Sequence, residues 1–150
     1  MTCRIVLIFS FIFYIGFYTN AQCHKYAKEN ALSKLSPFTP GGPPNCGMLN
    51  AGGKMRFEVT LYSGQNYRVL PAAQEVLGNV SFNLRDVEGN IIFSSKANGN
   101  AEYWDFDLES TQLIIMEVEA LAVKASDEYV PRGCVALLVG FKKQSKSRKK

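Results

Sequence analysis

Histidine is nearly absent from this 150-residue chain, and its scarcity removes most catalytic chemistry from consideration. His24 is the only histidine, so a Ser–His–Asp triad would have to use it. Ser63, in the stretch YSGQ, lacks the Gly-x-Ser-x-Gly setting of a nucleophile elbow. No glycine-rich segment has the spacing of a phosphate-binding loop. The sequence therefore predicts a protein that is not an enzyme.

Long apolar runs are absent after residue 21. Before it, Arg4 is followed by the apolar segment Ile5–Tyr18 and by Thr19-Asn20-Ala21. This run is shorter than the ~20 residues of a membrane-spanning helix, and we interpret residues 1–21 as a signal peptide cleaved after Ala21. The alternatives are a membrane helix, or a lipoprotein anchored at Cys23, although Gln22 precedes that cysteine where a small residue is wanted. We expect an extracytoplasmic protein, periplasmic or secreted, with no transmembrane segment in the mature chain.

Cysteine is sparse, and an odd number remains after cleavage: Cys23, Cys46 and Cys134. In an oxidising compartment we expect one disulfide and one remaining thiol, which also permits a cross-linked dimer. Three pairings are possible, with a slight preference for Cys23 with Cys134, which would tie the N-terminal segment to the last strand. A structural metal site needs four ligands, and a chain with one histidine is not expected to supply them.

Positive charge is concentrated at one end of the chain. The totals are 17 basic and 13 acidic residues, but residues 22–141 contain only ten of the basic ones. We expect residues 142–150 to form a disordered basic tail. Alternatively, the tail binds an anionic surface; nucleic acid is not expected, since no aromatic residue is present to stack on bases. The tail's basic residues are Lys142, Lys143, Lys146, Arg148, Lys149 and Lys150.

From Lys54 onward, apolar and polar residues alternate with the two-residue period of half-buried strands. The predicted strands are residues 54–62, 65–70 (ended by Pro71), 80–85, 91–94, 104–108, 112–120 and 133–141. The last is apolar on both faces and is predicted to be a central strand covered on both sides. The pattern predicts an all-β fold, an antiparallel β-sandwich or jelly-roll-like domain of about seven or eight strands over residues 54–141.

Residues 22–53 are predicted to form a separate N-terminal region. A short helix is expected over Cys23–Leu35, with Tyr26, Ala27, Ala31 and Leu35 on one face, ending near Pro37. Residues 36–53 are rich in proline and glycine and are expected to form a loop without regular structure.

Two groups of side chains on residues 103–109 are candidate binding sites. Asp105, Asp107 and Glu109 share one face of a predicted strand and could hold calcium through carboxylate oxygens; otherwise they form a solvated face, and no other cofactor is expected. Trp104 could join Tyr103 and Tyr62 in an aromatic platform for a sugar ring. Alternatively, Trp104 belongs to the core with Phe106 and Leu108.

Four segments carry a family resemblance: FEVTLYSGQNYRVL, GNVSFNLRDVEGNIIF, YWDFDLESTQLIIMEVEA and GCVALLVGF. Together with the preceding CHKYAKENALSKLSPF, this series resembles a group of uncharacterised exported proteins of the Bacteroidota. More distantly, it is similar to the bacterial pre-peptidase C-terminal domains, in which a strand ends in Gly-Gln-x-Tyr, as at Gly64, Gln65 and Tyr67 here. The resemblance implies a jelly-roll-like sandwich with a non-catalytic role, and it supplies no catalytic residue.

These observations predict an exported, non-catalytic β-sandwich protein that binds a protein or glycan partner at the cell envelope. One alternative is a secreted hydrolase that uses paired carboxylates of the acidic strand, although glycosidases need two carboxyl groups across a cleft. Another is adhesion to the envelope surface through residues 142–150.

Overall fold

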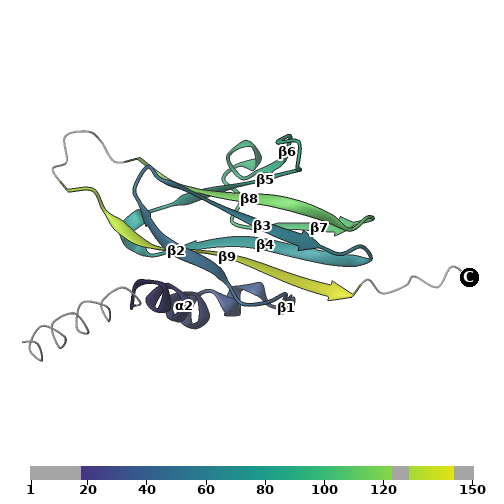
Figure 1. Cartoon of the computed structure of the whole chain (residues 1–150), viewed down its shortest axis with the longest axis horizontal. Helices are drawn as coiled ribbons and strands as arrows, with labels where there is room; N and C mark the ends of the chain where they lie inside the picture. Colours follow the sequence, from purple (N-terminus) through teal and green to yellow (C-terminus); the bar gives the residue numbers. More distant parts are fainter. Residues whose placement is uncertain (1–17, 123–128, 144–150) are drawn as a thin grey trace, which may run out of the picture.

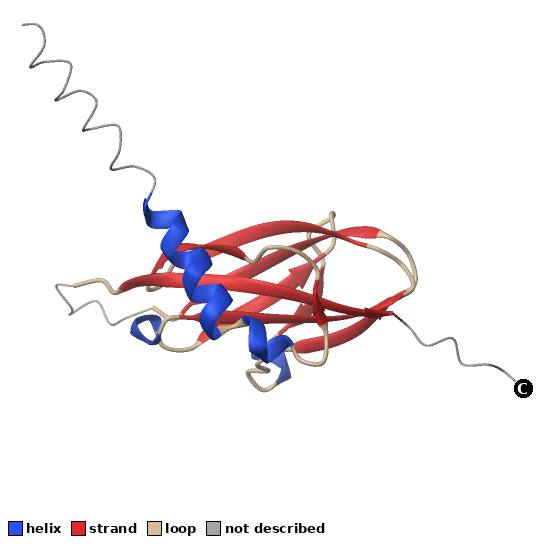
Figure 2. Ribbon diagram, turned by 90° about the horizontal axis from the view of Figure 1, so that it is seen from below, coloured by secondary structure: helices blue, strands red, loops and turns tan. Residues whose placement is uncertain are grey.

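Two antiparallel β-sheets stack face to face, and a helix lies against the outer face of one of them (Figures 1 and 2). The computed structural model describes residues 18–122 and 129–143. The sheet under the helix, called here the helix-covered sheet, has the order β1-β9-β4-β7, and β2 also pairs with β9. Its strands are β1 (Thr39–Pro40), β2 (Asn45–Asn50), β4 (Gln65–Ala73), β7 (Trp104–Leu108) and β9 (Arg132–Lys143).

The second sheet, called here the solvent-faced sheet, has the order β3-β8-β5-β6. Its strands are β3 (Lys54–Leu61), β5 (Val80–Arg85), β6 (Ile91–Ser94) and β8 (Gln112–Ala120). The fold-class prediction is confirmed: the described residues form an antiparallel β-sandwich with one short N-terminal helix. The nine strands exceed the predicted seven or eight because β1 and β2 lie in the segment that was expected to be a loop.

The strand β9 occupies the centre of the helix-covered sheet, as its apolar sequence predicts. Val135 and Leu137 point into the core between the sheets, whereas Leu138 belongs to a separate cluster beneath the helix. Both faces of β9 are therefore buried, which explains why its sequence shows no alternation of apolar and polar residues. The strand begins one residue earlier and ends two residues later than predicted.

The helix α2 (Tyr18–Asn30) packs on this sheet through small side chains, and a 3₁₀ turn, η2 (Leu32–Leu35), continues it. Cys23, Ala27, Ala31 and Leu35 are spaced four residues apart and are almost completely buried. The predicted helical segment ends at Leu35, before Pro37, as expected. It begins five residues earlier than predicted, so α2 includes residues on both sides of the predicted cleavage position. No helix among the described residues is long and apolar enough to cross a membrane.

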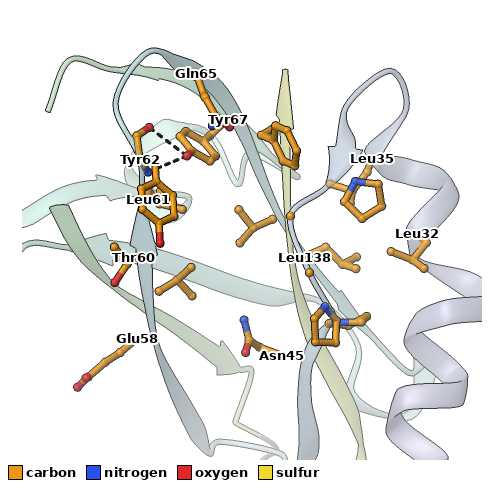
Figure 3. Close-up of a pocket in the computed structure, with 18 residues that line it drawn as sticks. Leu32, Leu35, Asn45, Glu58, Thr60, Leu61, Tyr62, Gln65, Tyr67 and Leu138 are labelled. Carbon is orange, nitrogen blue, oxygen red and sulfur yellow. Dashed lines mark hydrogen bonds between the residues drawn. The ribbon is translucent and has the colours of Figure 1, made fainter. Parts of the chain in front are cut away.

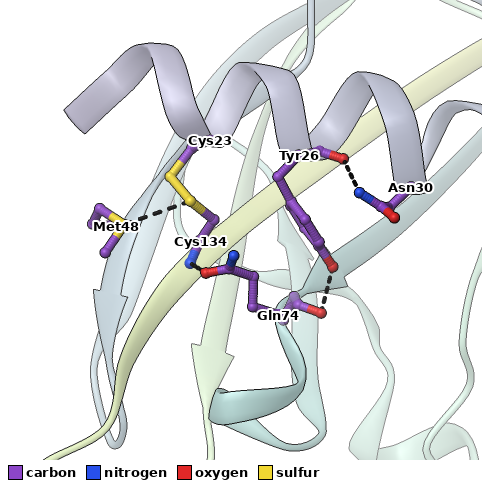
Figure 4. Close-up of a disulfide and its surroundings, with 7 residues drawn as sticks. Cys23, Tyr26, Asn30, Met48, Gln74 and Cys134 are labelled. Carbon is purple, nitrogen blue, oxygen red and sulfur yellow. Dashed lines mark hydrogen bonds between the residues drawn. A yellow bond between two sulfur atoms is a disulfide. The ribbon is translucent and has the colours of Figure 1, made fainter. Parts of the chain in front are cut away.

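A disulfide joins Cys23 of α2 to Cys134 of β9, the pairing that was preferred among the three possible ones (Figure 4). The Met48 sulfur lies 3.5 Å from Sγ of Cys134. Beside the disulfide, the Tyr26 hydroxyl donates a hydrogen bond to the carbonyl of Ala73. Cys46 is a free, half-buried thiol on β2, and burial raises its pKa.

Several boundaries predicted from sequence are wrong. Residues 36–53 are not entirely loop, because residues 39–40 and 45–50 pair with β9. Pro71 does not end β4, which continues to Ala73; β7 pairs with β4 only as far as Val69, so Pro71 has a partner strand on one side only and is tolerated there. Lys142 and Lys143 belong to β9 rather than to a disordered tail.

Candidate binding groove

The two edge strands on one side of the sandwich, β2 and β3, diverge from a common turn. They are joined at residues 51–53, where Gly52 has a positive φ of 78°. Near this turn the Met55 side chain of β3 packs against Gly47 of β2 and so bridges the two sheets. A Cβ atom added at Gly47 would lie only 2.8 Å from Met55 Cε. Farther along β3, residues 40–45 and the end of β9 lie across from Val59 and Leu61, and a groove opens between them.

This groove has a volume of about 490 Å³ and a mostly apolar lining (Figure 3). Val59, Leu61, Val139 and Phe141 contribute apolar surface from the two sheets. Polar groups come from Asn45, Thr60, Gln65 and the tyrosines 62 and 67, and Glu58 also lines the groove. A mostly apolar cleft with a few polar groups is the usual composition of a binding site.

Three of the four inward-facing side chains of β3 are less buried than those of its neighbour β8, and the fourth, Leu61, is buried. Met55, Phe57 and Val59 are only partly buried, although they pack against the core. By contrast, Met116 and Val118, their partners on β8, are fully buried. Of the three partly buried residues only Val59 lines the groove, and Leu61 beside it is already buried, so a ligand placed there would bury apolar surface on β3 chiefly at Val59.

The backbone of β3 is also open on this side. Within the described residues, β3 is hydrogen-bonded to β8 alone and forms an end of its sheet. In an antiparallel pair, about half of the backbone N–H and C=O groups of an edge strand point away from its partner, where they are available to another strand. The groove thus combines an apolar floor with a row of unused backbone donors and acceptors.

Tyr67 holds the end of β3 at the mouth of the groove. Its buried ring carries a hydroxyl that accepts a hydrogen bond from the Tyr62 amide (2.8 Å) and donates one to the Tyr62 carbonyl (3.0 Å), as Figure 3 shows. This pair of bonds fixes the backbone at Tyr62 while leaving that residue 61% exposed. Tyr62 is the one predicted platform residue that lines the groove.

The described lining of the groove offers few of the groups that catalysis uses. Among the residues that the structure describes, the lining contains one carboxylate, Glu58, and no histidine, cysteine, lysine or arginine. Acid–base catalysis at a glycosidic bond needs two carboxyl groups facing each other, and nucleophilic catalysis needs a base beside the nucleophile. The arrangement is suited to binding.

The predicted aromatic platform does not assemble. Trp104 faces the core, where its ring stacks on Phe106 (centroids 4.2 Å apart) and on Phe93 of β6 (4.6 Å). Tyr103 precedes it in the chain and packs instead over the Arg68 guanidinium, 4.3 Å from the ring centroid. The three residues of the platform therefore lie in three different environments.

The predicted calcium ligands are likewise not gathered into one site. Asp105 forms a bidentate ion pair with Arg68. Arg68 Nε donates to Asp105 Oδ1 (2.7 Å), and Arg68 Nη2 donates to Asp105 Oδ2 (2.6 Å). Asp107 is exposed on β7, and Glu109 lies beyond the end of that strand. Across residues 18–122 and 129–143, no three His, Cys, Asp or Glu side chains are close enough together to hold a metal ion. Asp105 would have to leave Arg68 to bind calcium.

The remaining candidate residues lie away from the groove or outside the described segments. His24 is exposed on α2, and its neighbour Cys23 cannot act as a thiolate while it is disulfide-bonded. Lys142 packs over the Phe38 ring at 4.4 Å, and Lys143 is exposed. Lys146, Arg148, Lys149 and Lys150 lie outside the described residues, as does most of the predicted signal peptide.

Sequence reasoning missed most of the groove, including Asn45, Glu58, Val59 and Thr60. The alternation in β3 looks the same as that of a strand paired on both sides, because the two-residue period reports the face of a side chain and not the neighbours of a strand. The prolines at residues 43 and 44, between β1 and β2, were the available signal that a short stretch without strand pairing lies beside an edge.

The fold and the groove define a class of protein: a two-sheet antiparallel β-sandwich with one disulfide-bonded helix and an open lateral groove. No family model matches the chain, and no curated protein matches it. Among solved structures, the chain is similar to the periplasmic inhibitor of g-type lysozyme, PliG, of Aeromonas hydrophila. The match has 14% sequence identity and a TM-score of 0.47, and it covers 66% of this chain and 84% of that chain.

Proposed function

We propose that this protein is an exported, non-catalytic binding protein that takes an extended segment of a protein partner into the groove beside β3. The observation that carries the proposal is the coincidence of an unpaired strand edge with an exposed apolar floor. A segment added to a sheet edge gains backbone hydrogen bonds, while its alternate side chains enter the groove. A glycan is the other candidate ligand, but its hydroxyl groups do not follow the regular spacing of the backbone donors and acceptors along β3.

Export is part of the same proposal. The signal-peptide pattern of residues 1–21 and the Cys23–Cys134 disulfide both suit an oxidising compartment outside the cytoplasm. The resemblance to exported proteins of the Bacteroidota and to pre-peptidase C-terminal domains points the same way. Mass spectrometry of the secreted protein should find Gln22 at the N-terminus. A cytosolic protein that keeps residues 1–21 would contradict this part of the proposal.

The binding proposal is tested with the full secreted chain against a displayed library of random twelve-residue peptides, with a glycan array in parallel. We expect enriched peptides to bind wild type and to protect the backbone amides of residues 58–61 from hydrogen exchange. Val59→Arg should weaken binding at least tenfold, because the new charge blocks the apolar floor. The matched control is Ile92→Arg on β6, the other edge strand of the same sheet, where the residue is already 42% exposed.

The hydrogen-exchange footprint on wild type keeps the test decisive even if Val59→Arg folds poorly. A footprint elsewhere, or the absence of any enriched peptide, would refute the groove as a peptide site. Glycan binding that is lost in Tyr62→Ala would identify a sugar as the ligand instead. Self-association that Val59→Arg abolishes, seen by analytical ultracentrifugation, would identify a second copy of this chain as the occupant.

A further inference from the structure

Glu58 is the one formally charged residue among the 18 that line the groove. The other lining residues are apolar or carry neutral polar groups. Any electrostatic preference of the groove for its ligand therefore depends chiefly on this single carboxylate.

Glu58 differs from the other carboxylates on the outer face of its sheet. Glu117 Oε2 lies 3.4 Å from Arg56 Nη2, and Glu119 Oε2 lies 2.8 Å from Lys96 Nζ. Within the described residues, no lysine or arginine nitrogen lies within 4.0 Å of the Glu58 carboxylate. The residue opposite Glu58 on β8 is the uncharged Ile115. In Figure 3 its side chain extends from β3 away from Asn45 and the helix. Among the described residues, the groove thus has an exposed negative charge at its rim that no lysine or arginine contacts within 4.0 Å.

Strand pairing places a ligand side chain beside this charge. A segment paired with the free edge of β3 has side chains that alternate between the groove and the outer face of the sheet. The residue opposite Glu58 would point to the outer face, with its Cβ about 4.5–5.5 Å from that of Glu58. The residues before and after it would point inward, toward the apolar surface around Val59 and Phe141.

We propose that the groove selects an extended segment in which a lysine or arginine stands between two apolar residues. The basic side chain would form an ion pair with the Glu58 carboxylate. This inference rests on the proposed function and adds the chemistry of the ligand. Opposite charges across strands are worth up to about 1 kcal/mol, and like charges oppose pairing by a similar amount. The preference for a basic over a neutral residue should therefore reach about fivefold.

The test uses three synthetic peptides that are identical except for Lys, Gln or Glu at the central position, taken from a sequence enriched on wild type. Isothermal titration calorimetry should give the affinity order Lys, Gln, Glu, with an advantage for Lys that shrinks as salt is added. In Glu58→Gln the difference should largely disappear, and in Glu58→Lys the order should invert. The matched control is Glu102→Lys, which makes the same charge change at an exposed position before β7 and should keep the wild-type order.

The outcomes separate this inference from the proposed function. Peptides that bind in a Val59-dependent way, but with equal affinity whatever the central charge, would overturn the role of Glu58 and leave the groove intact as a peptide site. The absence of peptide binding in the groove would overturn both. A salt-dependent preference for Lys that persists in Glu58→Lys would show that another group reads the charge, and would also overturn the inference.

Discussion

The two lateral edges of the sandwich are stabilised in different ways. At the edge formed by β6 and β7, aromatic rings close the gap between the sheets from inside: Phe93 and Trp104 stack with their centroids 4.6 Å apart. At the edge formed by β2 and β3, the strands diverge and the groove opens. The helix α2 lies on that side of the molecule and contacts β2 and β9. The Cys23–Cys134 disulfide attaches it to the outer face of β9.

The difference shows how an edge can stay open without loosening the fold. If the open edge were filled by large side chains, as the closed one is, no groove would remain. The covalent attachment of α2 instead stabilises β9 at Cys134, which does not line the groove, although Leu32 and Leu35 of η2 do line it. The comparison makes four predictions about stability, ordered by the size of the expected effect.

Removing the disulfide should cost the most. The bond links residues 111 apart in sequence, and closing so long a loop constrains the unfolded chain strongly. Cys23→Ser with Cys134→Ser should lower the free energy of unfolding by about 4 kcal/mol in urea titrations. The control Cys46→Ser removes the free thiol and should change it by less than about 1 kcal/mol. Equal effects of the two changes would mean that the disulfide between α2 and β9 contributes little to the free energy of unfolding.

Breaking the closed edge from inside should have the next largest effect. Trp104→Ala removes a ring stacked on Phe93 and Phe106 and should cost about 3 kcal/mol, near the lower end for buried aromatic residues because Trp104 is only half-buried. Tyr62→Ala, at an exposed ring beside the open edge, should cost less than about 0.5 kcal/mol. Thermal unfolding followed by circular dichroism measures both. A folded Trp104→Ala protein of normal stability that no longer binds its ligand would revive the aromatic platform.

The same truncation on neighbouring strands should show how open the β3 edge is. Val118→Ala on β8 removes fully buried methyl groups and should cost about 2 kcal/mol. Val59→Ala, at the half-buried floor of the groove, should cost under about 1 kcal/mol, since solvent already reaches that site. Chemical denaturation compares the two variants directly. A loss at Val59 as large as that at Val118 would indicate that the groove is packed shut in solution.

The smallest effect is expected on the outer face of the solvent-faced sheet. The hydrogen bond from Lys96, together with the charge of Lys54, holds the pKa of Glu119 below its usual range. A carboxylate with a lowered folded-state pKa stabilises the fold above its unfolded pKa of about 4.3, and this contribution is lost as the pH falls through the lower folded-state value.

Lys96→Met should therefore cost about 0.5 kcal/mol at pH 7, in the usual range for surface ion pairs. The difference from wild type should vanish in strong acid, because protonated Glu119 has no charge to pair with Lys96. Denaturant titrations at pH 7 and below pH 3 measure it. A stability difference that is the same at both pH values would show that Lys96 acts through packing rather than through charge.

The hairpin β5–β6 is among the elements whose bounds sequence predicted correctly, together with β7 and β8. Its strands match the predicted ranges 80–85 and 91–94, and Gly89 in the turn has a φ of 90°. In the same turn, Asp86 Oδ1 accepts hydrogen bonds from the amides of Glu88 and Asn90. All of these interactions are local, so a short stretch of residues contains the information for them.

The strand β2 shows where local reading stops. Its sequence, NCGMLN, contains few strong strand formers and follows two prolines, yet each of its residues is paired with β9. The partner supplies the stabilisation, since a central strand buried on both faces leaves backbone groups along its whole length that must be hydrogen-bonded. The strand propensities of residues 45–50 do not report the hydrogen-bonding needs of a strand that is distant in sequence.

Sequence by itself determined the class of fold, the inward and outward faces of its strands, and the helix face that includes Ala27 and Ala31. These follow from side-chain periodicity along a short stretch of chain. Only the tertiary structure decided which strands are edges, which cysteines pair, and that β2 and β3 diverge to leave a groove. The backbone hydrogen bonds of every strand are chemically alike, so the choice of partners depends on how distant parts of the chain pack together.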